Sequence, residues 1–208
     1  MRKSNLLTLA VLLCAANLVH ADAIYQVAVN TSSIAGVQGS IEFQFAAATG
    51  ETQEATVKLL NFTGGTLGIP TNIGEVTGGP LPATLTIGNG IQTNNVFNDL
   101  FETFTYGKSL TFTLDVGGPA VTAPNGLSTG NSLLVFLMYS DKAGNVPVLT
   151  NDPNGVAALV RVNPNGSVGR AALSPEVSFV PEPGSVWLIG GALGMLIGGR
   201  KRFTNRVG

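Results

Sequence analysis

The fold class is decided at residues 109–116, which read Ser109-Leu110-Thr111-Phe112-Thr113-Leu114-Asp115-Val116. Polar and apolar side chains alternate along this stretch, which is the period of a β-strand that buries one face and exposes the other. Residues 40–45 repeat the pattern, with Ile41, Phe43 and Phe45 between polar neighbours. Residues 133–138 are apolar throughout, as expected of a central strand covered on both sides. These stretches predict sheets built around one apolar core.

Turn signals separate these strands from further candidates. Clusters of Gly, Pro and Asn stand at residues 64–65, 78–80, 117–119, 124–126, 152–155 and 164–166. Strands are also expected at 24–29, 55–62, 83–87, 101–106, 156–162 and 177–180, and one short helix at 94–100. About ten short strands with such turns predict an all-β fold, namely a single antiparallel β-sandwich with a jelly-roll-like topology.

The charge distribution limits the partners of this domain. Between Asp22 and Val180 the chain has five basic and eleven acidic residues, which gives a net charge of −6. An acidic domain without a basic cluster excludes nucleic acid as an expected partner. The single cysteine, Cys14, lies in the apolar N-terminal run, so we expect no disulfide in the mature domain.

Residues 1–23 have the three parts of a secretory signal peptide. Arg2 and Lys3 are followed by an apolar run at 6–19, which is short for a bilayer span. Small residues allow signal peptidase to cleave after Ala21 or after Ala23. The sequence therefore predicts export through the Sec machinery. A retained N-terminal anchor is the less favoured alternative.

The C-terminus also has three parts. It reads Val180-Pro181-Glu182-Pro183-Gly184-Ser185, then has no charge up to Gly199, and continues with Arg200-Lys201-Arg202. The prolines keep the motif extended and accessible, because they fix φ and disfavour helix before them. As a helix the uncharged run would be roughly 22 Å long, less than the ~30 Å hydrocarbon core, so it is a marginal membrane span. The basic residues would stay in the cytoplasm and leave the domain outside.

This arrangement resembles the PEP-CTERM sorting signal of Gram-negative bacteria that make exopolysaccharide. The start of the mature chain, YQVAVNTSSIAG at 25–36 and GSIEFQF at 39–45, is similar to small secreted β-sandwich proteins of that family. The resemblance implies that a membrane peptidase, exosortase, recognises the motif Pro181, Glu182, Pro183 and Gly184 and removes the tail. An ordinary tail anchor behind a Pro-rich linker is the alternative.

The expected organisation is a signal peptide at 1–23, a β-sandwich at 24–180 and a sorting signal at 181–208. Within the sorting signal, the motif is 181–184, the single transmembrane helix 185–199 and the basic tail 200–208. Gly190, Gly194 and Gly198 form a small-residue face that would let another helix approach closely. A simple abundance of small residues in such tails is the preferred explanation of that face.

The mature domain lacks the residue types of common catalytic sites. Residues 24–180 contain no histidine and no cysteine, since His20 lies in the signal peptide. This excludes Ser-His-Asp and Cys-His catalysis and zinc held by His or Cys. Carboxylates remain, and the pairs that could serve a glycosidase are Glu51 with Glu54, Asp99 with Glu102, and Asp141 with Asp152.

Each of these carboxylate pairs has a simpler explanation in surface solvation or in a turn, so we expect no catalytic residue and no cofactor. The loops at 141–145 and 151–154 offer oxygen ligands for calcium, but their spacing is not that of an EF-hand, so we assign no metal site.

The sequence thus favours an exported, non-enzymatic protein. Its tail would anchor it transiently in the membrane, and its mature domain would be structural or adhesive at the cell surface or in an exopolysaccharide matrix. The alternatives are a carbohydrate-active enzyme using two carboxylates and a glycan-binding module. A glycan-binding module would present exposed aromatic rings, whereas Tyr25, Tyr106 and Tyr139 all fall on expected strands.

Overall fold

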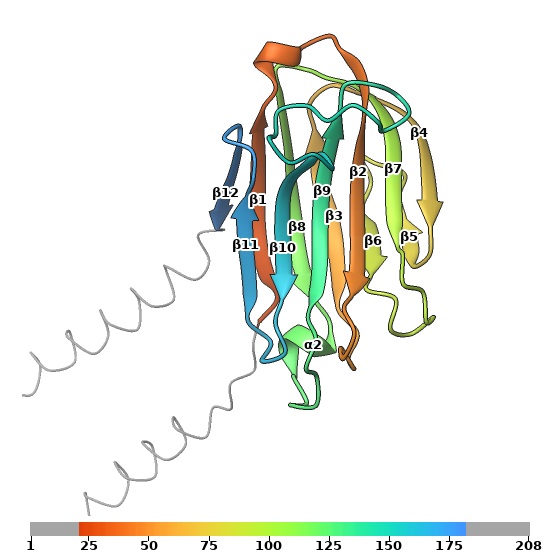
Figure 1. The fold of residues 1–208 in the computed structure, drawn as a ribbon, viewed down its shortest axis with the longest axis vertical. Coiled ribbons are helices and arrows are strands. Elements are labelled where there is room, and N and C mark those ends of the chain that lie inside the picture. Colours follow the sequence, from red (N-terminus) through yellow and green to blue (C-terminus); the bar gives the residue numbers. More distant parts are fainter. Residues whose placement is uncertain (1–20, 182–208) are drawn as a thin grey trace, which may run out of the picture.

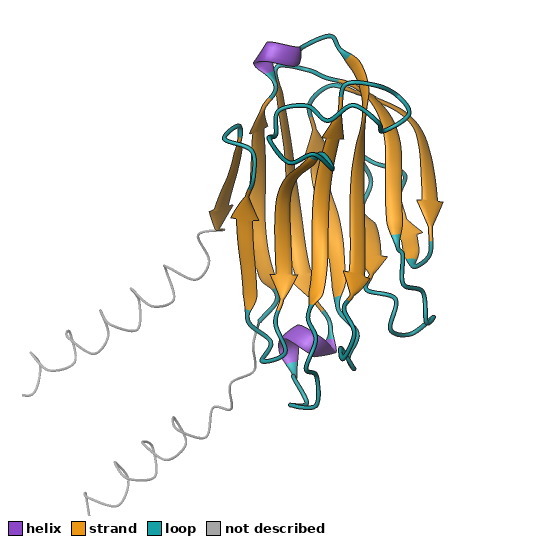
Figure 2. Cartoon of the chain, viewed as in Figure 1, coloured by secondary structure: helices purple, strands orange, loops and turns teal. Residues whose placement is uncertain are grey.

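The computed structural model describes residues 21–181, which form two antiparallel sheets packed face to face (Figure 1). Sheet A has six strands in the order β12-β1-β8-β3-β6-β5, and sheet B has six in the order β11-β10-β9-β2-β7-β4. Within residues 21–181, helix is confined to two short segments (Figure 2). The prediction of an all-β sandwich is confirmed.

The bounds of the elements follow the alternating segments of the sequence. Sheet A contains β1 (Ala23–Asn30), β3 (Thr56–Thr63), β5 (Val76–Gly78), β6 (Leu85–Gly88), β8 (Ser109–Gly117) and β12 (Val177–Pro181). Sheet B contains β2 (Gln38–Ala47), β4 (Thr66–Ile73), β7 (Asp99–Thr105), β9 (Ser132–Tyr139), β10 (Val156–Val162) and β11 (Val168–Ala172). The helical segments are a 3-10 turn at Ser32–Ile34 and α2 at Pro119–Thr122.

An aromatic cluster holds the two sheets together. Phe112 of sheet A packs edge-on against Phe43 and Phe136 of sheet B, with ring centroids 5.3 Å apart in both pairs. Phe43 stacks on Phe136 at 4.8 Å. All three rings are buried and belong to the core between the sheets. Such pairs stabilise by about 0.5–1.5 kcal/mol beyond the burial of their area, so this cluster is a main source of cohesion between the sheets.

The structure contains strands that the sequence pattern did not predict. Residues 21–181 contain twelve strands, and β4, β5 and β11 are the unpredicted ones. β4 contains Gly68 and Pro70, which are poor strand formers, but it lies at the edge of sheet B, where a proline is tolerated. β5 has only three residues, and β11 is rich in small residues. Their pairing with longer neighbours decides their conformation.

The prediction of a short helix at 94–100 is wrong. Residues 99 and 100 begin β7, residue 94 ends a turn, and residues 95–98 are irregular with a bend at 96. Asn98 fixes this path, because its side-chain amide donates to the Phe45 carbonyl at 3.0 Å and its side-chain oxygen accepts the Glu75 N–H at 2.8 Å. Val96 and Phe97 are exposed, so the helical spacing of apolar residues has no core to pack against.

Both ends of the described chain lie at the same end of sheet A. β1 and β12 are antiparallel neighbours, and Tyr25 pairs with Pro181. Within residues 21–181 no helix is long and apolar enough to cross a membrane. Most of the signal peptide lies outside the described residues, and so does the predicted sorting signal beyond Pro181, including Glu182, Pro183, Gly184, the glycine face and the basic end.

Candidate functional site

The outer face of sheet B carries an unusual set of outward-pointing side chains. In register across β2 and β7, Gln44 lies opposite Asp99, Glu42 opposite Phe101, Ser40 opposite Thr103 and Gln38 opposite Thr105. The loop at 140–155, between β9 and β10, crosses one end of this sheet (Figure 1). Carboxyl groups and apolar side chains therefore share a face that is partly covered by the chain itself.

Glu42 and Asp99 form a buried carboxyl pair on this face. Glu42 is 9% exposed and Asp99 is 3% exposed. Gln44, which lies opposite Asp99 in register, donates from Nε2 to Glu42 Oε1 at 2.5 Å. Asp99 Oδ1 has no hydrogen-bond partner among the described residues. Burial, together with the neighbouring Glu42, raises the pKa of Asp99 to about 8, so Asp99 holds its proton at neutral pH.

The loop at 140–155 is fixed over this face by polar contacts. The Tyr139 hydroxyl donates to the Asn154 carbonyl at 3.1 Å, and burial, with the nearby Glu42 carboxyl, raises the pKa of Tyr139. Asp141 Oδ1 accepts the Asn145 and Val146 N–H groups at 2.9 and 2.8 Å. These bonds lower the pKa of Asp141, and the carboxylate organises its own turn.

The geometry of the Glu42 and Asp99 pair does not match that of a glycosidase. Carboxyl groups of a retaining enzyme lie about 5–5.5 Å apart and those of an inverting enzyme further, so that a sugar fits between them. Glu42 and Asp99 are instead 9% and 3% exposed, and neither lines a hollow that could hold a sugar.

Glu102 lies on the other face of the same strand. It is opposite the core residue Ile41 and is 1% exposed. Its Oε2 atom has no hydrogen-bond partner among the described residues, and burial raises the pKa of Glu102 to about 7. Residues three apart on a strand point to opposite faces, so the structure does not bring the predicted pair of Asp99 and Glu102 together.

The predicted pair of Glu51 and Glu54 is engaged within turns and loops. Glu51 Oε1 accepts the Thr52 and Gln53 N–H groups at 2.8 and 2.9 Å. Glu54 accepts a hydrogen bond from Gln92. Glu51 therefore stabilises its own turn, whereas Glu54 joins its loop to a residue 38 positions further along the chain.

The predicted pair of Asp141 and Asp152 is used in the same way. Asp152 Oδ1 accepts the Asn154 N–H at 2.9 Å, as Asp141 accepts amides of its own loop. In the described part of the chain there is no cluster of three or more His, Cys, Asp or Glu side chains that could hold a metal ion.

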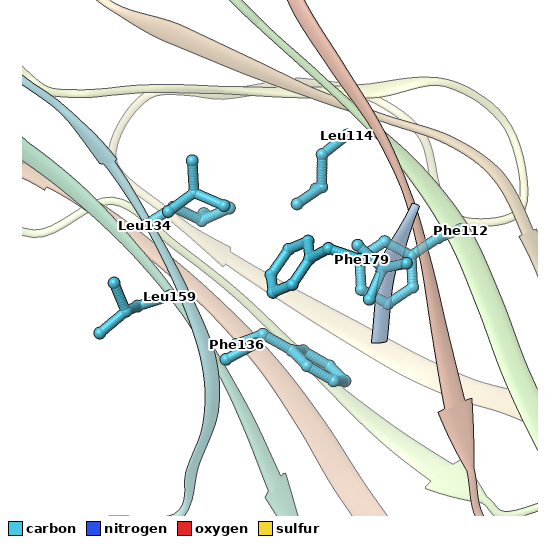
Figure 3. Close-up of a pocket in the computed structure, with 9 residues that line it drawn as sticks. Phe112, Leu114, Leu134, Phe136, Leu159 and Phe179 are labelled. Atoms are coloured by element: carbon cyan, nitrogen blue, oxygen red, sulfur yellow. The ribbon is translucent and has the colours of Figure 1, made fainter. Parts of the chain in front are cut away.

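A small void lies between the two sheets near β12 (Figure 3). Side chains of both sheets converge on it, and the labelled ones are Phe112, Leu114, Leu134, Phe136, Leu159 and Phe179. Its volume is about 10 Å³ and its lining is almost wholly apolar. A water needs roughly 10–15 Å³ and polar partners, so this void is a dry packing gap and not a ligand pocket.

A second, larger hollow lies over β4, β7 and β2 on the outer face of sheet B. Its volume is about 160 Å³, and its lining consists of Gln38, Thr66, Leu67, Gly68, Thr103, Phe104, Thr105 and Lys142. It contains hydroxyl, amide and ammonium groups but no carboxyl group. Sequence reasoning missed this site because β4 was not predicted. The alternating Thr103 and Thr105 on an expected strand were the available signal.

None of the three tyrosines considered from the sequence is exposed. Tyr25, Tyr106 and Tyr139 are 8%, 2% and 6% exposed. The Tyr106 hydroxyl donates to the carbonyls of Ser40 and Tyr139 at 2.8 and 3.0 Å, so this ring joins β2 to β9. A stacking platform for sugar rings is not built from these residues.

Comparison with known proteins gives no match: no family model, no curated protein and no solved structure matches this chain. A proposal of function therefore depends on the chain's own residues. These are the two terminal segments of the sequence and the outer face of sheet B.

Proposed function

We propose that this chain is an exported bacterial protein of the cell surface or extracellular matrix, sorted by a PEP-CTERM signal. In this proposal the helix at 185–199 holds the protein in the membrane until exosortase cleaves at Pro181–Pro183. The observation that carries the proposal is the order of motif, uncharged run and basic end at the C-terminus. The mature sandwich then acts as a structural or adhesive component of an exopolysaccharide matrix.

The boundaries of the sandwich support this proposal. β1 begins at Ala23, one of the two proposed signal-peptidase sites. Because β1 and β12 are adjacent, both proposed cleavages would fall at one end of one sheet. Removing both terminal segments would leave the body of the sandwich and its core intact.

The strand pairing supports the jelly-roll-like interpretation of this sandwich. A jelly roll is a long antiparallel hairpin wrapped into two sheets. In this chain β1 pairs with β8, β2 with β7 and β3 with β6, as such a wrapped hairpin requires. The strands β9 to β12 then extend the two sheets on one side.

The alternative of an enzyme with two carboxylates has weaker support. The Glu42 and Asp99 carboxyls are buried, and neither they nor any other acid lines the 160 Å³ hollow. The structural or adhesive role is therefore the one that we propose.

The test is the intact mass of the protein from its native producer, with the envelope and the medium kept apart. We expect a species that starts at Asp22 or Ile24 and ends near Pro181–Pro183, with or without an added group. Retention of residues 187–208, in membranes only, would mean that the tail is a plain anchor and would overturn the sorting proposal.

A pair of variants separates the motif from a general effect of proline loss. The double variant Pro181→Ala, Pro183→Ala should keep the tail and accumulate in the membrane. The control Pro175→Ala removes a proline outside the motif and should be processed like the parent chain.

A further inference from the structure

The hollow over β4, β7 and β2 has a specific structural cause. The pairing of β4 with β7 is interrupted by a bulge between Leu67 and Pro70. Gly68 lies in this bulge, where a Cβ atom would overlap the Thr103 side chain and stand 2.8 Å from the Thr103 carbonyl oxygen. The Ile69 N–H donates to Thr103 Oγ1 at 3.1 Å and keeps the bulge in place. Bulges commonly reshape a strand beside a binding site.

The side chains over the hollow form a polar row. Thr66, Thr105 and Gln38 lie in register on three adjacent strands. Neighbouring strands are about 4.8 Å apart, so the row spans roughly 10 Å. Gln38 and Thr66 are exposed and Thr105 is half-buried, so their polar groups are open to solvent. Two hydroxyls and one amide are therefore available as both donors and acceptors.

Lys142 adds a positive charge to this row from the loop at 140–155. The loop is held next to the hollow, because Ser40 Oγ donates to the Asp141 carbonyl at 2.8 Å. The Asp141 carboxylate is engaged by the amides of its own turn. In the part of the chain that the structure describes, the ion pair joins Lys58 to Asp115 and does not involve Lys142. The ammonium group is thus open to an external anion.

The size and chemistry of the hollow define its ligand. Its 160 Å³ is roughly ten times what one water needs. A row of neutral donors and acceptors fits the hydroxyls of a sugar ring, and an ammonium group at the rim fits a carboxylate. Phe104 is only 3% exposed, so the hollow lacks an open aromatic face for stacking. Polar groups therefore dominate recognition.

From these observations we propose that the hollow binds one sugar residue that carries a carboxylate, a uronic acid within an exopolysaccharide. The inference rests on the proposed function, because an extracellular matrix supplies such a glycan. The uronate carboxylate pairs with Lys142, and the ring hydroxyls bond to Thr66, Thr105 and Gln38.

The test uses trigalacturonate and its methyl ester, two ligands with the same rings that differ in the charge of the carboxyl groups. Binding is measured by calorimetry on protein purified from cells that express the full 208-residue chain. We expect the acid to bind and the ester to bind at least about tenfold more weakly, as for the loss of a charge-assisted contact.

Matched variants locate the binding. Lys142→Ala should weaken binding of the acid at least about tenfold, whereas Arg161→Ala removes an equal charge from the exposed outer face of β10 and should leave it unchanged. Thr105→Val keeps the β-branched shape and should weaken binding roughly three- to tenfold, as for one neutral hydrogen bond. Unchanged near-ultraviolet circular dichroism would show that each variant is folded.

Three results would overturn the inference. They are no binding of the acid at tens of millimolar, equal binding of acid and ester, and equal losses in Lys142→Ala and Arg161→Ala. The intact mass of the exported protein separates this inference from the proposed function. A chain that is processed at Pro181–Pro183 but does not bind trigalacturonate would refute the sugar site and leave the sorting proposal standing. A chain that binds but keeps its tail would refute the sorting proposal alone.

Discussion

The carboxyl groups on the outer faces of the two sheets lie in opposite environments. On sheet A, Asp115 lies in register with Lys58, whose Nζ is 2.9 Å from Asp115 Oδ2, and this contact raises the pKa of Lys58. On sheet B, Asp99 has a similar outward position, but its neighbours are Gln44 and the acid Glu42. An outward position on a strand therefore does not make a carboxyl group solvated or paired.

The difference comes from what covers each face. The Lys58 and Asp115 side chains remain 43% and 17% exposed, so water contributes to their solvation. On sheet B, Leu137 and Tyr139 point outward, yet they are only 4% and 6% exposed. The loop at 140–155 contributes to this cover, since Gly144 approaches the Phe101 and Tyr139 rings. Sheet B thus has a second apolar layer, and acids next to it lose their hydration.

The largest effect is expected from breaking this cover at Gly155. Gly155 has φ +84°, and a Cβ atom there would lie 2.8 Å from the Tyr139 ring. Gly155→Val should lower the free energy of unfolding by about 3 kcal/mol or more, because it combines backbone strain with a clash. The measurement is urea unfolding. The control Gly126→Val also has a positive φ, of +72°, but meets nothing within 4 Å, and should cost about 1 kcal/mol. Equal losses of unfolding free energy in Gly155→Val and Gly126→Val would mean that the loop covering sheet B does not contribute to stability.

The next largest effect is that of Asp99 on the free energy of unfolding, and it depends on pH. The folded chain keeps the Asp99 proton up to a pKa of about 8, whereas the unfolded chain releases it near the ordinary value of 3.8. The unfolded state thus binds fewer protons between these values, so stability falls as pH rises through this window. Asp99→Asn removes that loss. It should raise the free energy of unfolding by about 2–3 kcal/mol at pH 9 and change it little at pH 4.

Unfolding curves of parent and Asp99→Asn chains at a series of pH values test this expectation. A constant difference between the two chains across pH 4–9 would mean that the Asp99 carboxyl does not titrate as its burial predicts.

Glu102, inside the core, should also lower the stability of the fold as pH rises, but by less than Asp99. Burial raises the pKa of Glu102 from an ordinary 4.5 to about 7. The loss of folding stability that comes from ionising Glu102 therefore grows between these two pH values and is constant above pH 7. Glu102→Gln should stabilise the protein by about 1–2 kcal/mol at pH 8 and hardly at all at pH 4.5. A gain that continues to rise between pH 7 and pH 9 would contradict the assignment, because that window belongs to Asp99.

The smallest effect is expected on sheet A. Lys58→Ala breaks the pair with Asp115 and should cost about 0.5–1 kcal/mol, a loss that shrinks in 1 M salt, as for a pair that is partly exposed. Lys108→Ala, an exposed lysine in a turn, is the control and should be neutral. If Lys58→Ala lowered the free energy of unfolding more than Gly155→Val, the outer face of sheet A, and not that of sheet B, would contribute more to stability.

The sequence predicted most of the strands but not the edges of the sheets. Alternation identified β8 and β2, because each of these strands buries one face in the core. It failed for β4, where Gly68 and Pro70 interrupt the pattern, since an edge strand is stabilised by its neighbour and not by its own propensity. The helical spacing of apolar residues at 94–100 also led to a wrong prediction. The hydrogen bonds of Asn98 to Phe45 and Glu75 outweigh the weak local preference for helix.

The candidate site could be predicted only in part. Asp99 was recognised as a carboxyl that could act in a pair, but its expected partner, Glu102, faces the core. Its actual neighbour, Glu42, comes from β2, far away in the chain. Lys142 was expected only as part of a polar loop, and its place beside Thr66 and Thr105 depends on how that loop folds over the sheet.

The amino-acid sequence by itself determined the sandwich class, the acidic charge and the lack of histidine and cysteine between residues 24 and 180. These properties follow from composition and from a period of two residues, which any segment carries locally. Only the tertiary structure decided that Asp99 meets Glu42, that Glu102 is buried, and that threonines of β4 and β7 join Lys142 around a hollow. Strand order and register make residues that are distant in the sequence into neighbours, and no local pattern contains that information.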